Sequence, residues 1–136
     1  MSLKRITQFF NPSSVAVIGA SNISTRAGFV VMRNLLQGGF KGPIMPVTPS
    51  HSAVHGVLAY PTIADLPKVP DLAVICTNKN TLIDIIEQLG ELGCKTAIVI
   101  ADGLSGEQKS ALKACAQAKQ VTLLGPNCLG LLIPHI

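Results

Sequence analysis

The segment from Gly19 to Gly28 has the composition best suited to binding an anion. It lies between an apolar run and an amphipathic one, where free backbone N–H groups at a helix start attract phosphate. Ser21 adds a hydroxyl donor and Arg26 adds a positive charge. The dinucleotide fingerprint Gly-x-Gly-x-x-Gly is not met, because Ala20 and Ser21 stand where its second glycine should be. The segment therefore predicts an anion site, with a turn that only caps a helix as the alternative.

A second polar loop follows the next apolar run and contains Val47, Thr48, Pro49 and His51. An NAD site would place Asp or Glu at the end of this strand to accept from the ribose hydroxyls. Thr48 stands there instead, and together with His51 it can donate hydrogen bonds to a phosphorylated ribose. The loop therefore argues against plain NAD and for a nucleotide with an extra phosphate. A proline-rich turn without a ligand remains open.

Three further loops also follow apolar runs. Either Thr77 or Asn78 is predicted to cap the next helix, and a second role beside a ligand stays open. Asp102 can accept from a ligand hydroxyl or amine, or only from loop amides. Asn127 is expected to hold the rigid turn 125–130. Cys128 in that turn has no acid–base partner indicated by the sequence, so no nucleophile is predicted.

The chain carries no motif for a reaction of its own. There is no Gly-x-Ser-x-Gly elbow, no pair of carboxylates and no cysteine–histidine spacing that would bind zinc. The acidic residues do not gather at the predicted strand ends. We therefore predict a binding module for a phosphate-rich nucleotide, with no catalytic and no metal-ligating residues.

These loops are positioned by an alternation of short apolar runs and helical stretches. Strands are predicted at 15–18, 44–47, 72–76, 96–100 and 121–124, and helices at 27–36, 80–92 and 105–118. A lead-in helix is expected at 3–10, and 49–70 is a proline-rich connection with a helical turn near 62–66. The pattern predicts an α/β fold, a doubly wound, Rossmann-like and mainly parallel five-stranded sheet with helices on both faces. Ligands of such sheets bind at the carboxyl ends of the strands.

Composition narrows the class of protein further. The 136 residues fit a single domain, 1–136, and only 13% of them are charged against 48% hydrophobic. The low charge suggests a surface covered by other domains or subunits, and a homo-oligomer is compatible with it. The net charge of +4 is spread singly, which argues against nucleic acid. No apolar run is long enough for a membrane span and the first ten residues lack a signal peptide, so we expect a cytoplasmic location with reduced thiols.

Several segments together resemble the N-terminal CoA-binding domain of NDP-forming acyl-CoA synthetases, a family related to the succinyl-CoA synthetase α subunit. The matching segments follow one another along nearly the whole chain: 14–21, 34–36 with 39–42, 46–49, 71–75 and 125–130. Residues 26–28, 32–36 and 76–78 look most like the bacterial Pat-type protein lysine acetyltransferases. Those proteins join such a region to a C-terminal acetyltransferase domain.

The resemblance implies that the chain binds CoA or acyl-CoA. The 19–21 turn and the helix start at 26–28 would face its phosphates, 47–49 would flank the adenosine, and 77–78 with Asp102 would edge the pantetheine. His51 stands where succinyl-CoA synthetases have a phosphate-supporting lysine, which implies a weaker, pH-dependent contact. The family's phosphohistidine and catalytic domains come later in the chain. The resemblance thus implies an N-terminal fragment whose partners are the downstream domains of a ligase or acetyltransferase.

Two other functions remain as alternatives at this point. The first is an NAD(P)-binding oxidoreductase domain, against which Thr48 and the broken glycine fingerprint count. The second is a structural domain that has lost its ligand and serves only for contact between subunits, which the low charge would suit.

Overall fold

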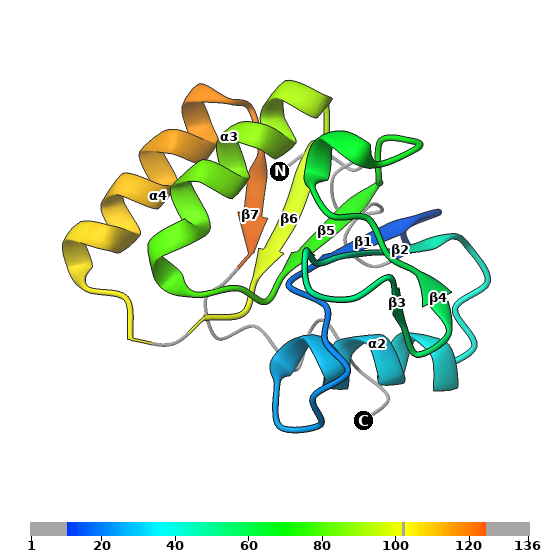
Figure 1. Cartoon of the computed structure of the whole chain (residues 1–136). Helices are drawn as coiled ribbons and strands as arrows, with labels where there is room; N and C mark the ends of the chain where they lie inside the picture. The colour runs from blue at the N-terminus through cyan, green and yellow to red at the C-terminus, as the bar shows by residue number, and fades with distance from the viewer. Residues whose placement is uncertain (1–10, 102, 125–136) are drawn as a thin grey trace.

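The computed structural model describes residues 11–101 and 103–124, which form a five-stranded sheet flanked by helices (Figure 1). The strands follow one another across the sheet in the order β2-β1-β5-β6-β7, and every neighbouring pair is parallel. Their bounds are β1 (Val15–Ile18), β2 (Ile44–Val47), β5 (Leu72–Ile75), β6 (Thr96–Val99) and β7 (Thr122–Leu124). The predicted α/β fold with a parallel sheet is confirmed.

The central strands are apolar because both of their faces are covered. Every residue of β1, β5 and β6 is buried. In β1, Ala16 and Ile18 join one hydrophobic cluster, while Val15 and Val17 join a second one on the opposite face. This alternation follows from the strand, in which successive side chains point to opposite faces. Unbroken apolar runs, rather than alternating ones, are therefore what such strands require.

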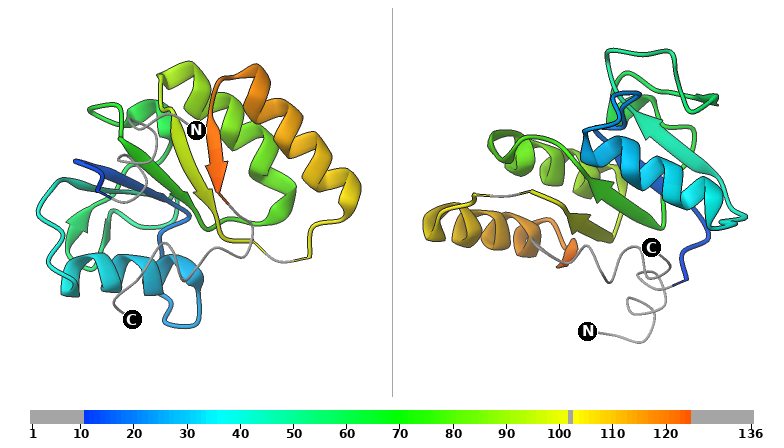
Figure 2. Two further views of the ribbon diagram at one scale, coloured as in Figure 1. Left: turned by 180° about the vertical axis from the view of Figure 1, so that it is seen from behind. Right: turned by 90° about the horizontal axis from the view of Figure 1, so that it is seen from below.

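Helices cover the two faces unequally (Figure 2). Helix α2 (Ala27–Gln37) packs on one face, whereas α3 (Leu82–Leu92) and α4 (Gly106–Ala118) lie side by side on the other. Helix α4 begins with a capping box, since Ser105 Oγ accepts from Gln108 N and the Gln108 side chain accepts from Ser105 N. The prediction of helices on both faces is confirmed.

The long connection after β2 holds more structure than the sequence analysis predicted. A short antiparallel hairpin is formed by β3 (Ala53–Val54) and β4 (Val57–Leu58). Its turn is His55–Gly56, and both residues have positive φ, 52° and 79°, as a tight hairpin turn requires. The helical turn expected near 62–66 is present as η1 (Ile63–Asp65).

The remaining differences are at element ends. Strands β5 and β6 each end one residue earlier than predicted, and β7 begins at Thr122 rather than at 121. The helix expected from 80 begins as a short 3-10 turn, η2 (Lys79–Thr81), before α3. The lead-in helix predicted at 3–10 lies outside the described residues. Among the residues that are described, no helix combines the length and apolarity needed to cross a membrane.

Candidate functional site

The strand order reverses between β1 and β5, so the loops after these two strands face each other. The chain leaves β1 toward β2 on one side, and the later strands are added on the other side. Gly19, directly after β1, has φ +87°, and a Cβ there would lie 2.9 Å from Thr77 Cγ2 and 3.1 Å from the carbonyl carbon of Cys76. Only glycine suits this conformation and this spacing. In doubly wound sheets this is the place where ligands bind.

Helix α2 starts against the same loop. A Cβ on Gly28 would lie 2.0 Å from the carbonyl oxygen of Gly19 and 2.9 Å from Ala20 Cα. The absence of a side chain at Gly28 therefore lets the first turn of α2 touch the backbone of the loop. Arg26 is the exposed N-cap of this helix, and its side chain makes no capping hydrogen bond. No acidic residue occupies the first turn, so the positive end of the helix dipole lies at the site without a fixed counter-charge from that turn.

Two buried hydroxyls lie at this edge of the sheet, Ser21 at 6% and Thr48 at 6% exposure. Ser21 Oγ accepts from Ile23 N at 2.9 Å, and Thr48 Oγ1 accepts from Ser50 N at 3.2 Å. Each bond uses a lone pair of the oxygen and leaves the hydroxyl hydrogen free to donate. Both oxygens are thus fixed by their own turns and keep a donor for a ligand.

Hydrogen bonds on both sides of β2 fix the backbone that carries Thr48. Thr48 N donates to Tyr60 O at 2.9 Å on the outer side, and Gly19 N donates to Val47 O at 3.0 Å on the inner side. The loop after β2 is therefore attached directly to the loop after β1. Pro49, which follows, is exposed, and His51 is half-buried.

The loop after β5 is stabilised by its own polar side chains. Asn78 Oδ1 accepts from Asn80 N at 2.8 Å and caps η2, which confirms the predicted cap for Asn78. Thr77 Oγ1 accepts from Thr81 Oγ1 at 2.9 Å. Lys79 Nζ donates to Gly103 O at 2.8 Å and so connects this loop to the one after β6. Lys79 was not among the site residues predicted from the sequence.

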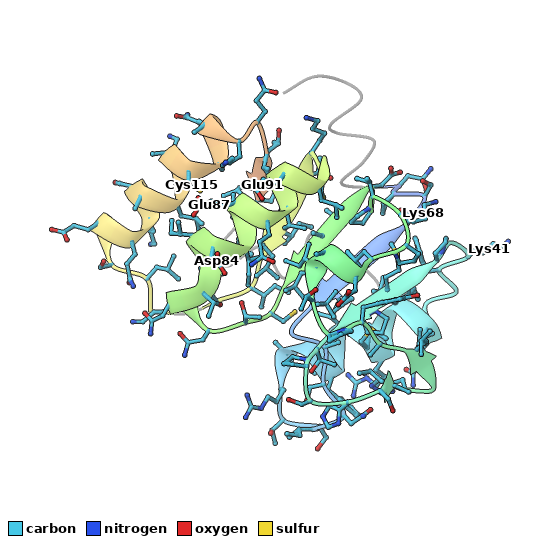
Figure 3. All side chains as sticks on the ribbon, turned by 45° about the horizontal axis from the view of Figure 1, so that its top comes forward. Lys41, Lys68, Asp84, Glu87, Glu91 and Cys115 are labelled. Atoms are coloured by element: carbon cyan, nitrogen blue, oxygen red, sulfur yellow. The ribbon has the colours of Figure 1, made fainter. Side chains whose placement is uncertain are left out.

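The charge at this edge favours an anion. The segments 19–26, 48–52 and 76–81 contain no Asp or Glu, whereas they contain Arg26 and Lys79. Acidic side chains gather elsewhere, and Figure 3 shows three of them, Asp84, Glu87 and Glu91, along α3. The same figure shows Lys41 and Lys68 well apart from these three acidic side chains. With no acid directly after β2, a ribose would find no carboxylate to accept from its hydroxyls, as an NAD site would provide.

The described thiols are not set up as nucleophiles. Burial raises the pKa of Cys76 to about 12 and that of Cys94 to about 11. It also raises the pKa of Cys115. The thiolate is the reactive form, and burial removes it at neutral pH. Within residues 11–101 and 103–124, no group of three His, Cys, Asp or Glu side chains lies close enough to hold a metal ion.

The structure brings most of the predicted site residues to one edge of the sheet. Around Gly19 it places Ala20, Gly28, Val47 and Thr77, with Ser21 and Thr48 in the adjoining turns. Asp102 and Asn127 lie outside the described residues. Asn22 was missed as an individual residue, although its side chain bonds to the β3–β4 hairpin. The only sequence signal for this hairpin was the His-Gly pair of its turn, and that pair predicts a hairpin turn less strongly than Asn-Gly or Asp-Gly.

Known proteins are similar to this chain in sequence and in fold. The chain is 34% identical over 129 residues to the ADP-forming acetate–CoA ligase of Methanocaldococcus jannaschii, covering 92% of this chain and 18% of the ligase. It is 36% identical over 135 residues to a trans-feruloyl-CoA synthase from an unknown prokaryote, covering 95% of this chain and 19% of that protein. An acetyl-coenzyme A synthetase structure from Candidatus Korarchaeum cryptofilum, with phosphate and ADP, superposes with a TM-score of 0.87 at 34% identity, covering 92% of this chain and 28% of that one.

The chain therefore spans less than one third of the length of each of these relatives. All three are named as enzymes that form acyl-CoA, and none of the three is named as a lysine acetyltransferase. Residues 13–134, which include every segment of the site described above, match the CoA binding domain family. With its parallel sheet, its glycine-lined edge and this match, the chain belongs to the CoA binding domain family, and it is similar to the corresponding part of ADP-forming acyl-CoA synthetases.

Proposed function

We propose that the carboxyl edge of this sheet binds CoA or acyl-CoA, and that the chain supplies this site to a larger CoA ligase. The observation that carries the proposal is the close approach of Gly28 to Gly19, where a Cβ would lie 2.0 Å from a backbone oxygen. That approach holds the start of α2 against the loop after β1. A phosphate at this place would meet backbone N–H groups and the positive end of a helix.

The polar groups around this point suit the parts of CoA. The pyrophosphate would lie between the 19–21 turn and the helix start at Arg26. The adenosine end would lie by Val47, Thr48 and Pro49, where a hydroxyl donor replaces the carboxylate of an NAD site, and His51 follows. The pantetheine would extend past Thr77 and Asn78 toward Asp102. The absence of acids from segments 19–26, 48–52 and 76–81 supports this assignment, because CoA carries several negative charges.

The parent protein is proposed to be a CoA ligase. The relatives reported above are named for ligation of acetate or for feruloyl-CoA synthesis, which favours a ligase over the Pat-type lysine acetyltransferase. The bond-forming steps would then belong to the domains that follow in the parent chain.

Calorimetric titration with CoA tests the proposal, with Arg26→Ala as the variant. Arg26 is exposed at the N-cap of α2 and makes no capping bond, so its removal leaves the fold intact. The variant is expected to bind CoA more weakly by about 1.5–3 kcal/mol, the range for a hydrogen bond to a charged group. Higher salt should reduce this difference, because the contact is exposed.

Lys41→Ala is the matched control. It also removes one exposed positive charge, but Lys41 precedes β2 and lies at the opposite, amino edge of the sheet. Its affinity for CoA should equal that of the unmodified chain. NADH, tested in parallel, should bind more weakly than CoA. Absence of CoA binding, or tighter binding of NADH, would refute the proposal, and equal affinities of the two variants would remove Arg26 from the site.

A further inference from the structure

A polar side chain of the loop after β1 forms two hydrogen bonds to the β3–β4 hairpin. Asn22 Nδ2 donates to Ala53 O at 2.9 Å, and Asn22 Oδ1 accepts from His55 N at 3.2 Å. These bonds join segments that are 31 and 33 residues apart in the sequence. Asn22 therefore uses both ends of its amide to connect the loop to the hairpin.

The segments that Asn22 joins both lie next to residues of the candidate site. Asn22 directly follows Ser21, whose buried hydroxyl lies in the loop after β1. Ala53 begins the hairpin shortly after Thr48, the buried hydroxyl of the loop after β2. The Asn22 side chain thus bridges two segments that each carry one hydroxyl of the site.

A ring contact supports the same attachment from the helix side. The rings of Phe29, in the first turn of α2, and His55 lie with their centroids 4.5 Å apart. His55 Nε2 is buried and has no hydrogen-bond partner among the described residues. The backbone of His55 is held at φ 52°, a conformation that non-glycine residues adopt rarely. The hairpin turn is therefore positioned against the loop at the expense of local strain and an unpaired ring nitrogen.

We infer that Asn22 is a positioning residue for CoA, which fixes the turn that carries Ser21 against the hairpin that follows the Thr48 loop. This inference rests on the proposed function, because it concerns the geometry of the same site. Asn22 acts through the backbone of both loops and needs no contact with the ligand. Loss of its side chain should leave the sheet folded and the Gly19–Val47 hydrogen bond in place, but allow the turn that carries Ser21 to shift relative to the hairpin.

The test compares CoA affinity in Asn22→Ala and Ser14→Ala. Ser14 also forms a hydrogen bond between distant segments, since its Oγ accepts from Asp71 N at 3.0 Å, but at the amino edge of the sheet. We expect the dissociation constant for CoA to rise at least tenfold in Asn22→Ala and to change less than twofold in Ser14→Ala.

A measurement on the unmodified chain covers the case in which Asn22→Ala does not fold. If Asn22 couples the hairpin to the site, CoA must slow hydrogen exchange at the His55 amide, because coupling between sites is reciprocal. The Ser13 amide, which donates to Asp71 Oδ2 at 2.9 Å at the amino edge, is the reference. Equal slowing at both amides, or unchanged affinity in a folded Asn22→Ala, would overturn the inference. Failure of the unmodified chain to bind CoA would instead refute the proposed function.

Discussion

Replacement of Gly28 by alanine is the sharpest test of how this site is built. The added Cβ would lie 2.0 Å from the Gly19 carbonyl oxygen and 2.9 Å from Ala20 Cα. All of these are backbone atoms, so no side chain can rotate away to make room. The first turn of α2 must therefore move away from the loop after β1.

Two opposing effects determine how much Gly28→Ala changes the free energy of unfolding. Alanine in a helix interior is more favourable than glycine by about 1 kcal/mol at most. Overpacking typically costs about 1–3 kcal/mol, and a clash with rigid backbone belongs at the upper end of that range. The clash exceeds the gain in helix propensity, and we expect Gly28→Ala to lower the free energy of unfolding by roughly 1–2 kcal/mol. The displaced helix start should also weaken CoA binding at least tenfold.

Gly106→Ala is the matched control, because Gly106 is also in the first turn of a helix and a Cβ there meets no atom within 4 Å. It should leave stability unchanged or raise it, with unchanged CoA affinity. Urea unfolding gives the stabilities, and calorimetric titration gives the affinities. If Gly28→Ala proved as stable as Gly106→Ala and bound CoA equally well, the assignment of Gly28 as the contact that shapes the site would be refuted.

Two other predictions concern stability alone. Ser105→Ala removes the capping box of α4 and should lower the free energy of unfolding by about 1 kcal/mol in urea, with unchanged CoA affinity. The thiols of Cys76 and Cys94 should make stability fall in alkaline solution, because their folded pKa values of about 12 and about 11 exceed the unfolded value of 9.0. Their contribution is complete below pH 9 and is lost as pH rises toward the folded values, by about 1.4 kcal/mol per pH unit for each thiol. Urea unfolding from pH 8 to 11 checks the slope, which a Cys76→Ala, Cys94→Ala double variant should reduce; equal slopes would contradict the assignment.

The sheet could be predicted from the sequence because each central strand is a short, mostly apolar run. Val15–Ile18 and Leu72–Ile75 have no polar residue, and the structure buries both completely. The capping residues Ser105 and Asn78 were predictable for a similar reason, since short polar side chains before a helix have one dominant use. Local chemistry was sufficient in all of these cases.

The parts that could not be predicted depend on contacts between distant segments. The two-residue strands β3 and β4 are too short to show a pattern of their own, and their turn depends on a histidine at positive φ. Asn22 reads as an ordinary loop residue until the hairpin lies beside it. The role of Gly28 likewise depends on its proximity to Gly19 in the folded chain. The spacing of the two glycines in the sequence did not indicate this contact, because it departs from the dinucleotide fingerprint.

The pairing of Tyr60 with β2 limits how this sheet can grow. Tyr60 N donates to Pro46 O, Thr48 N donates to Tyr60 O, and Pro46 itself has no amide hydrogen to offer. A foreign strand approaching from this side would thus find the central backbone groups of β2 already engaged, and exposed edges of this kind are where chains otherwise aggregate. Tyr60 thus covers this edge of β2, and neither a helix nor a charged side chain takes part in covering it. A further chain would therefore extend the sheet more readily beyond β7.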